Sequence, residues 1–255
     1  MLQRRKVISI NISTGKYKDF IKEILFLAKK KESSYICVAN VHMTIEAYND
    51  ENFKNIVNSA DIITPDGMPL VKALKLLYRV EQDRVSGPDL MPDLLRKAES
   101  QGLSVFFYGS TEEVLKAIIK RARVEYPKLQ IAGTYSPPFR ELTGEEKEEI
   151  AELINDSGAN IVFVSLGCPK QEKWMAEMKG KINAVMIGVG AAFPIYAGTQ
   201  KRAPRWMQKL VLEWFYRLCQ EPRRLFKRYF YTNFKFLYLI SKELFRKKKK
   251  ECLKK

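Results

Sequence analysis

The sequence lacks the residues and patterns that metal sites, disulfide frameworks and membrane spans require. A single histidine, His42, excludes a multi-histidine metal site, and the four cysteines lie far apart without a CxxC pair. No run of about 18 apolar residues is present, so no segment is expected to span a bilayer. The N-terminal residues turn polar too soon for a signal peptide. We therefore expect a cytoplasmic protein without a metal or other cofactor, either soluble or peripheral to a membrane.

Acidic residues are scarce in the last fifth of the chain. From Lys201 to Lys255 there are 18 lysines and arginines against 4 acidic residues, a net charge of +14, whereas residues 1–200 carry only +2. This asymmetry indicates an anionic partner for the C-terminal end, either nucleic acid or anionic lipid. With 255 residues that are 46% hydrophobic, the chain can also bury a large core. We expect a nearly neutral domain at 1–200 and a basic helical appendage at 201–255.

Short β-branched or aromatic runs alternate with longer amphipathic patterns through the first 200 residues. This alternation predicts an α/β fold that is Rossmann-like, with a largely parallel sheet flanked by helices. A capping box is expected from Thr143 to Glu146, and Ser110 or Thr111 could cap the helix after Gly109. The strands are expected at 35–39, 61–64, 103–108, 129–132, 161–166 and 184–189, and the helices at 43–58, 68–78, 89–101, 111–126, 144–156 and 170–179.

After Ala203 the strand pattern ends and only helical patterns follow. One helix is expected near 204–220, and a second begins at Pro222, whose missing N–H is tolerated in a first turn, and runs to about 246. On a helical wheel the second helix is amphipathic, with an apolar arc of about 140°. That arc holds Leu225, Phe226, Tyr229, Phe230, Phe236, Leu237, Ile240 and Leu244. The opposite arc holds Arg223, Arg224, Lys227, Arg228, Lys235, Lys242 and Arg246.

Three interpretations fit this basic, aromatic end. It could pack on the body with a solvated basic back, bind nucleic acid, or lie on an anionic membrane surface. Its rings share the apolar arc with leucines and do not alternate with arginines, which favours a membrane over stacked bases. If one helix continued past Pro222, then Arg217, Arg224 and Arg228 would align and could bind a lipid diphosphate.

Glycine and polar residues follow several expected strands, where ligands bind in open α/β sheets. Glycine turns let backbone amides approach a phosphate, but no GxGxxG or Walker A pattern is present, and tight turns without a ligand fit equally well. The candidate substrate contacts at these strand ends are Asn40, Gly109, Ser110, Gly167, Lys170, Glu172, Gly188 and Gly190.

Asp66 is the carboxylate best placed for chemistry. It follows a strand and a proline and precedes Gly67, so its side chain could face the crevice and take a proton from an attacking hydroxyl. The alternative is a turn aspartate that caps the next helix. Arg84 could neutralise a phosphate or form a surface salt bridge, and for His42 we expect a structural role.

An ordered set of motifs resembles the WecG/TagA/CpsF family of bacterial glycosyltransferases. The motifs, between about residues 36 and 231, are PDGMPLV, DRVSGPDLM, VSLGCPKQEKWM, GVGAAF and AGTQKRAPRWMQKLVLEWFYRLCQEPRRLFKRY. The resemblance implies inverting, metal-independent transfer of a sugar, often N-acetylmannosamine, from a UDP-sugar. The implied acceptor is a polyprenyl-diphosphate-linked GlcNAc at the inner face of the cell membrane, in teichoic acid or other cell-surface polysaccharide synthesis.

The resemblance also implies roles for particular residues. Asp66 matches the general base, Arg84 and Gln171 match further catalytic positions, and Asn40 matches a substrate-binding asparagine. Two positions depart from the family pattern and would alter the sugar pocket. Val38 stands where a threonine is common, and Pro194 stands where many relatives have aspartate.

Two other functions remain open at this stage. One is an RNA-binding α/β protein that grips phosphates with its basic end, and the other is a UDP-sugar transferase with a soluble acceptor. A homo-oligomer is also left open.

Overall fold

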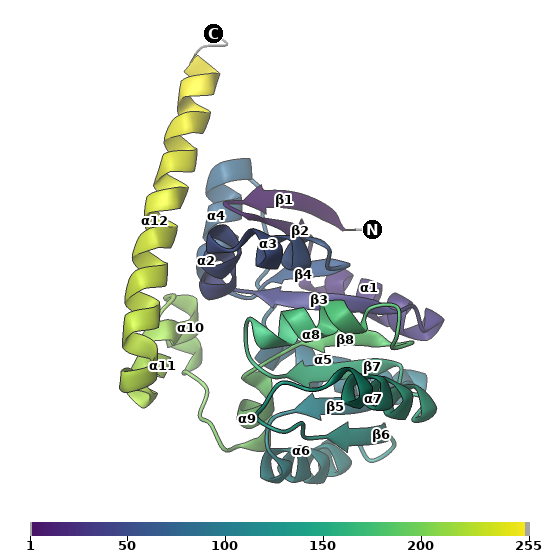
Figure 1. Ribbon diagram of the computed structural model, residues 1–255. Coiled ribbons are helices and arrows are strands. Elements are labelled where there is room, and N and C mark those ends of the chain that lie inside the picture. Colours follow the sequence, from purple (N-terminus) through teal and green to yellow (C-terminus); the bar gives the residue numbers. More distant parts are fainter. Residues whose placement is uncertain (1, 253–255) are drawn as a thin grey trace.

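The computed structural model describes residues 2–252, without the side chains of Lys209, Arg224 and residues 248–252. Its centre is a six-stranded parallel sheet in the order β4-β3-β8-β7-β5-β6 (Figure 1). The strands are β3 (Ser34–Ala39), β4 (Ile62–Pro65), β5 (Ser104–Gly109), β6 (Gln130–Tyr135), β7 (Ile161–Ser165) and β8 (Val185–Gly188). The predicted α/β class is confirmed, and all six predicted strands are found.

Helices cover both faces of the sheet and form two hydrophobic cores. Successive side chains of a strand point to opposite faces, so Ile36 and Val38 join one core and Cys37 the other. The first core is covered by α1 (Tyr17–Lys30), α5 (Gly87–Gln101), α6 (Glu112–Glu125) and α9 (Ala192–Ala197). The second is covered by α2 (Val41–Asn49), α3 (Glu51–Asn58), α4 (Met68–Tyr78), α7 (Gly144–Asp156) and α8 (Lys170–Met178).

Two features of the first 60 residues were not predicted. β1 (Gln3–Val7) and β2 (Ile10–Thr14) form an antiparallel hairpin beside β4, and α1 follows them. Four of the five residues of β1 are exposed, so that strand has no alternating pattern to read. The helix expected at 43–58 is two helices, because the Asp50 side chain accepts hydrogen bonds from the N–H groups of Asn52 and Phe53 and starts α3.

Three helices follow the sheet: α10 (Arg205–Lys209), α11 (Glu213–Gln220) and α12 (Pro222–Cys252). The helix expected near 204–220 is thus divided, and Val211, with φ of +66°, lies in the break. Pro222 begins α12 as predicted, but the helix continues to Cys252, beyond the expected end. It runs along one side of the molecule and past the hairpin (Figure 1). The division of the chain at residue 200 into two domains stays a prediction.

The apolar arc predicted for α12 is split between two environments, which corrects the helical-wheel analysis. Leu225, Phe236 and Ile240 are buried, the last two in the core beside α2 and α4, whereas Phe226, Phe230 and Leu237 from the same arc are exposed. The wheel shows how apolar residues cluster, but the neighbouring helices decide which part of the cluster they cover. Within the described residues, no helix is both long and apolar enough to cross a bilayer.

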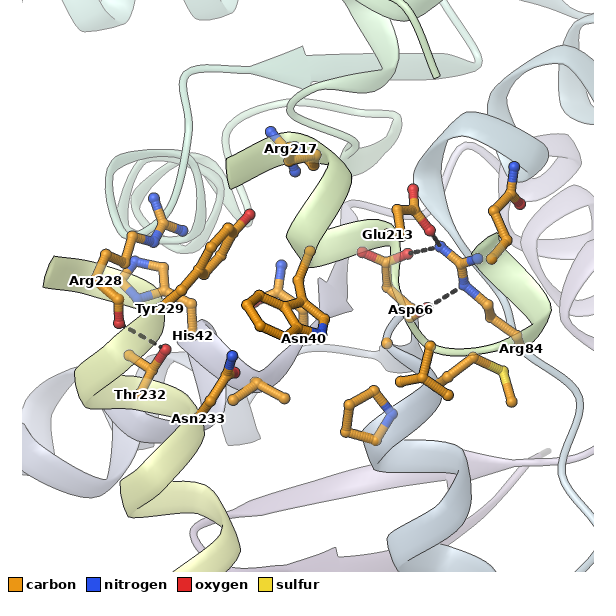
Figure 2. Close-up of a pocket in the computed structure, with 17 residues that line it drawn as sticks. Asn40, His42, Asp66, Arg84, Glu213, Arg217, Arg228, Tyr229, Thr232 and Asn233 are labelled. Atoms are coloured by element: carbon orange, nitrogen blue, oxygen red, sulfur yellow. Dashed lines mark hydrogen bonds and ion pairs between the residues drawn. The ribbon is translucent and has the colours of Figure 1, made fainter. Parts of the chain in front are cut away.

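Part of the predicted basic arc faces the body. Lys235 donates a hydrogen bond to the Asn49 side chain of α2 over 2.5 Å, and Arg228 lies beside His42 (Figure 2). Leu239, which falls outside the predicted apolar arc, is buried. The buried face of α12 is therefore rotated from the centre of the predicted apolar arc toward these residues.

The turn after β5 depends on Gly109. Its φ is +104°, and a Cβ atom there would lie 2.5 Å from the carbonyl oxygen of Ser165. The next residue, Ser110, has φ of +63° and donates its backbone N–H to the same carbonyl over 3.0 Å. This close approach joins the carboxyl ends of β5 and β7.

Replacing Gly109 with alanine should lower the free energy of unfolding by about 2–4 kcal/mol, because backbone strain and a backbone clash add together. Gly102→Ala is the matched control, since Gly102 has φ of +65° with nothing within 4 Å of an added Cβ. We expect a loss of about 1 kcal/mol there. Urea denaturation measures both, and equal losses would show that the turn relaxes freely.

Candidate functional site

A cleft lies at the carboxyl ends of β3 and β4, with α11 and α12 over it (Figure 2). It encloses about 760 Å³, including space open to solvent, which lies within the range of small-molecule sites. Asn40 and Asp66 come from the two strand ends, and Arg84 comes from the loop between α4 and α5. Residues of α11 and α12 complete the walls, so the cleft combines the sheet with the C-terminal helices.

Asp66 and Arg84 occupy one end of the cleft together with Glu213 (Figure 2). Arg84 Nε donates to the carbonyl oxygen of Asp66 over 2.5 Å, and Arg84 Nη2 donates to Glu213 Oε2 over 2.5 Å. The same Nη2 is 3.6 Å from Asp66 Oδ1. The N-cap of α4 is Gly67, without a side-chain capping bond, so the structure does not show Asp66 in the alternative capping role.

The surroundings of Asp66 favour its protonated form. Burial raises the pKa of this carboxyl from its ordinary value to about 6, and the negative charges of Glu213 and Asp89 act in the same direction. The positive charges of Arg84 and Arg217 lower the pKa and only partly offset these effects. A carboxyl with this pKa is ionised at neutral pH and remains basic enough to accept a proton from a hydroxyl during a reaction.

The other end of the cleft is polar and comes from α2 and α12. His42, Tyr229, Thr232 and Asn233 line it together with Arg228 (Figure 2). Burial and the charge of Arg228 lower the pKa of His42 to about 4, so the ring is neutral at neutral pH. The ring forms part of the cleft wall, and the structural role expected for His42 stays a prediction.

Asn40 has a structural task as well as a place in the cleft. Its side-chain oxygen accepts a hydrogen bond from the N–H of Met43 over 3.1 Å and caps α2. This bond fixes the Asn40 side chain at the carboxyl end of β3.

The arginines expected to align do not share one helix, because the chain breaks at Glu221 between α11 and α12. Arg217 and Arg228 nevertheless both line the cleft, one from each helix. The buried Nε atom of Arg217 has no hydrogen-bond partner among the described residues. The side chain of Arg224 lies outside the described part of the structure.

A second cleft lies at the carboxyl ends of β5 and β7 and includes Ser110 and Lys170, two of the predicted substrate contacts. Phe139, which is 93% exposed, stands at its edge. Tyr108 and Trp174 stack in its wall with ring centres 4.0 Å apart. The Tyr108 hydroxyl and Trp174 Nε1 are buried and have no hydrogen-bond partner within the described residues.

Gln171 and Glu172 are buried and are not among the residues that line these two clefts. Gln171 Nε2 donates to Glu172 Oε1 over 2.7 Å and to the carbonyl oxygen of Gly188 over 3.3 Å. A Cβ atom at Gly188 would lie 2.9 Å from Gln171 Nε2, and Gln171 also lies next to Gly190. In this structure Gly188 makes room for Gln171, whereas an added Cβ at Gly190 would be in ordinary contact with it. Gly167, with φ of +78°, serves a turn that a glycine adopts without strain.

Sequence reasoning missed several residues of the first cleft, which come mainly from the C-terminal helices. They are Glu213, Trp214, Tyr229, Thr232 and Asn233. One signal was available, since Glu213 is among only four acidic residues after position 200. Among the residues with described side chains, no group of three or more His, Cys, Asp or Glu could hold a metal ion.

Comparison with known proteins identifies the family of this chain. Residues 5–250 match the model of the glycosyl transferase WecG/TagA/CpsF family. A protein of Bacillus spizizenii is 32% identical over 226 residues, which cover 88% of this chain and 86% of the relative. A protein of Bacillus subtilis is 34% identical over 196 residues, 76% of this chain and 75% of the relative. Both relatives are named N-acetylglucosaminyldiphosphoundecaprenol N-acetyl-beta-D-mannosaminyltransferase. The chain therefore belongs to the WecG/TagA/CpsF family of glycosyltransferases.

Proposed function

We propose that the protein transfers N-acetylmannosamine from a UDP-sugar to a polyprenyl-diphosphate-linked GlcNAc, without a metal ion and with inversion at the anomeric carbon. The sugar and the lipid acceptor are those in the names of the two relatives. The observation that carries the proposal is Asp66, a carboxyl with a raised pKa at a strand end between two arginines. The product would serve teichoic acid or other cell-surface polysaccharide synthesis.

The proposed reaction is a single displacement at the anomeric carbon of the donor. The acceptor hydroxyl attacks this carbon while Asp66 takes its proton, and the bond to the diphosphate breaks so that UDP leaves. The leaving diphosphate gains negative charge, which nearby cations stabilise most strongly where water is excluded. Arg84 and Arg217 face the carboxyl in the same cleft and are the cations proposed for this task.

We assign the lipid diphosphate of the acceptor to the part of the cleft closed by α11 and α12. Arg217 and Arg228 enter the cleft from these helices, and guanidinium groups bind phosphate oxygens through paired hydrogen bonds. The unpartnered Nε of Arg217 supports this assignment.

The second cleft is the proposed site of the donor nucleotide. It offers an exposed aromatic ring at Phe139 for a base and the basic side chain of Lys170 for phosphate. Arg140 also lines this cleft, where its guanidinium is paired with Glu146. A continuous series of contacts joins the second cleft to the first. The Ser110 N–H donates to the carbonyl oxygen of Ser165, and the Ser165 hydroxyl donates to the carbonyl oxygen of Gly190 over 2.9 Å. Val189, next to Gly190, lies against Gly87, which is three residues after Arg84. A UDP-sugar lying along this edge would extend its sugar toward Asp66.

We also propose that α10–α12 bind the inner face of the cell membrane. Eleven of the eighteen exposed large hydrophobic residues that the structure describes lie between Trp206 and Phe245. Phe226, Phe230 and Phe234 form a row of rings on α12, with centres 6.1 and 4.7 Å apart. Rings of this kind enter the acyl boundary while lysines and arginines meet anionic headgroups.

The RNA-binding alternative needs a direct test on this surface. The sequence separated rings from basic residues, but the structure exposes Lys227 on the same helix as the ring row. The lipid-linked acceptor of the relatives favours the membrane. RNA binding would also leave the buried charges around Asp66 without a role.

The Asp66→Asn variant should lose about 10²–10⁴-fold in turnover, because the proton acceptor is removed. It should also be more stable above pH 6, by about 1–2 kcal/mol. The folded-state pKa of about 6 lies above the ordinary 3.8, so the stabilising contribution of the protonated form is lost as pH rises through 6. An uncharged amide avoids that loss, and the difference in stability between the variant and the wild type should disappear near pH 4.

UDP release and thermal unfolding, both measured across pH, test this prediction. Asp156→Asn, an exposed position at the end of α7, is the control and should change neither quantity. Turnover close to wild type in Asp66→Asn would exclude Asp66 as the base.

The wild-type protein should release UDP from UDP-N-acetylmannosamine only when a polyprenyl-diphosphate-GlcNAc acceptor is present. The rate should fall as pH drops through about 6, where Asp66 becomes protonated. A panel of UDP-sugars and a soluble GlcNAc acceptor complete the assay. Equal turnover with the soluble acceptor would contradict the lipid-linked substrate, and a better donor would correct the sugar.

Replacing Phe226, Phe230 and Phe234 together with serine should weaken binding to anionic phosphatidylglycerol vesicles at least about tenfold, because three exposed rings no longer enter the lipid. Point changes are preferable to deletion, since removing α12 would uncover the core beneath it. Vesicle flotation measures binding, and higher salt should weaken it further.

A matched control places three serines on other faces of the body, at Phe26, Val124 and Leu153, which are also exposed. This variant should float with the vesicles like the wild type. Unchanged flotation of the ring variant, or wild-type binding to RNA but not to vesicles, would exclude the membrane surface.

A further inference from the structure

Glu213 makes the contact that connects the C-terminal helices to the Asp66 end of the cleft. We infer that Glu213 is a positioning residue of the transfer reaction, which holds the Arg84 guanidinium against the backbone of Asp66 and out of hydrogen-bond distance of the Asp66 carboxylate. This inference rests on the proposed role of Asp66 as the base. It assigns a task in the reaction to an acidic residue of an otherwise basic segment.

The geometry of Arg84 shows what Glu213 competes with. Arg84 Nη2 lies 2.5 Å from Glu213 Oε2 but 3.6 Å from Asp66 Oδ1, which is beyond hydrogen-bond distance. Both carboxylates therefore face the same nitrogen, and Glu213 holds it. The side chains of Arg84, Asp66 and Glu213 are 17%, 23% and 21% exposed, so solvent screens their charges only partly.

The chain places Glu213 at this point by an unusual turn. Val211, a β-branched residue, has φ of +66° between α10 and α11, a conformation that such residues rarely adopt. The backbone N–H of Val211 donates a hydrogen bond to the carbonyl oxygen of Gln208 over 3.2 Å, and that of Leu212 donates to the carbonyl oxygen of Met207 over 2.8 Å. Glu213 then opens α11, where the positive end of the helix dipole favours a carboxylate.

Removal of the Glu213 charge would lower the pKa of Asp66 in two ways. The carboxyl faces Arg84 from the loop before α5, Glu213 and Arg217 from α11, and Asp89 from α5, which is itself paired with Arg202. Without Glu213 one negative neighbour is lost, and Arg84 is released to pair with Asp66. Both changes lower the pKa of Asp66, and the paired carboxylate is a weaker base that is partly covered by the guanidinium.

The test is the Glu213→Gln variant of the full-length protein, assayed by UDP release from UDP-N-acetylmannosamine with the lipid-linked GlcNAc acceptor. We expect the acid limb of kcat to move to lower pH by about half a unit or more, and kcat on the plateau to fall about tenfold. Glu213→Asp keeps the charge and should restore the position of the limb in part.

The control is Glu221→Gln, which removes the same charge at the opposite end of α11, next to the break before α12. Glu221 accepts a hydrogen bond from Gln200 over 3.2 Å, away from Arg84. This variant should keep the wild-type pH profile. An equal shift in both variants would mean that the net charge of the helices, and not the contact with Arg84, sets the profile.

A second readout does not depend on activity. The stability gained by Asp66→Asn is measured across pH in the wild-type background and in the Glu213→Gln background. In the wild type this gain should grow between about pH 4 and pH 6 and then level off, and without Glu213 it should level off at lower pH and be smaller. If the wild type transfers no sugar from any donor, the proposed function fails, while this double-variant comparison still tests the coupling of Glu213 to Asp66.

Two results would overturn the inference. An unchanged acid limb in Glu213→Gln, together with an unchanged stability comparison, would show that Glu213 does not influence Asp66. A higher kcat/KM in Glu213→Gln would show that Glu213 competes with a substrate phosphate for Arg84 and does not position it.

Discussion

Keeping the Asp66 carboxylate ionised in a largely buried site costs free energy, and the other groups of the cleft determine how much of that cost is offset. Burial alone disfavours the charge, while full pairing with an arginine would make the carboxylate too weak a base to accept a proton. The structure lies between these extremes, with Arg84 bonded to the Asp66 backbone and Arg217 nearby. Arg84 Nη2 lies 3.6 Å from the carboxylate, near enough to attract its charge but too far for a hydrogen bond. With a pKa of about 6 the group is ionised at neutral pH and still basic.

The C-terminal helices hold their charged residues in the cleft because α12 has two apolar surfaces, one buried against the body and one exposed. Leu225, Phe236 and Ile240 are buried on the inner side of α12, while the row of rings at Phe226 and Phe230 faces outward. The inner surface fixes α12 against α2 and α4, and with it the cleft residues of α12. Attachment to a surface through the outer rings would therefore act on the same rigid helix that forms the cleft wall.

The sheet could be predicted from sequence because its strands are buried on both faces and appear as short β-branched runs. Asn40 and Asp66 directly follow two of these strands, so their place at the carboxyl ends of the sheet could be predicted as well. The buried face of α12 could not be predicted, since a wheel shows which residues cluster but not which neighbour covers them. Nor could the partner of Arg84, because Glu213 lies 129 residues away and meets it only through the turn at Val211. Gln171 matched a family motif, but motif spacing carries no information on burial.

The proposed base and most of the cations of the cleft come from different parts of the chain. Asp66 and Arg84 belong to the sheet and its loops, whereas Arg217 and Arg228 are contributed by α11 and α12. Without these helices the sheet would keep its carboxyl but lose two of the three arginines that, among the described side chains, line this cleft. It would also lose Glu213, the residue that holds Arg84 off the carboxylate. In the proposed reaction, proton transfer and stabilisation of the leaving group would therefore both require the helices in place.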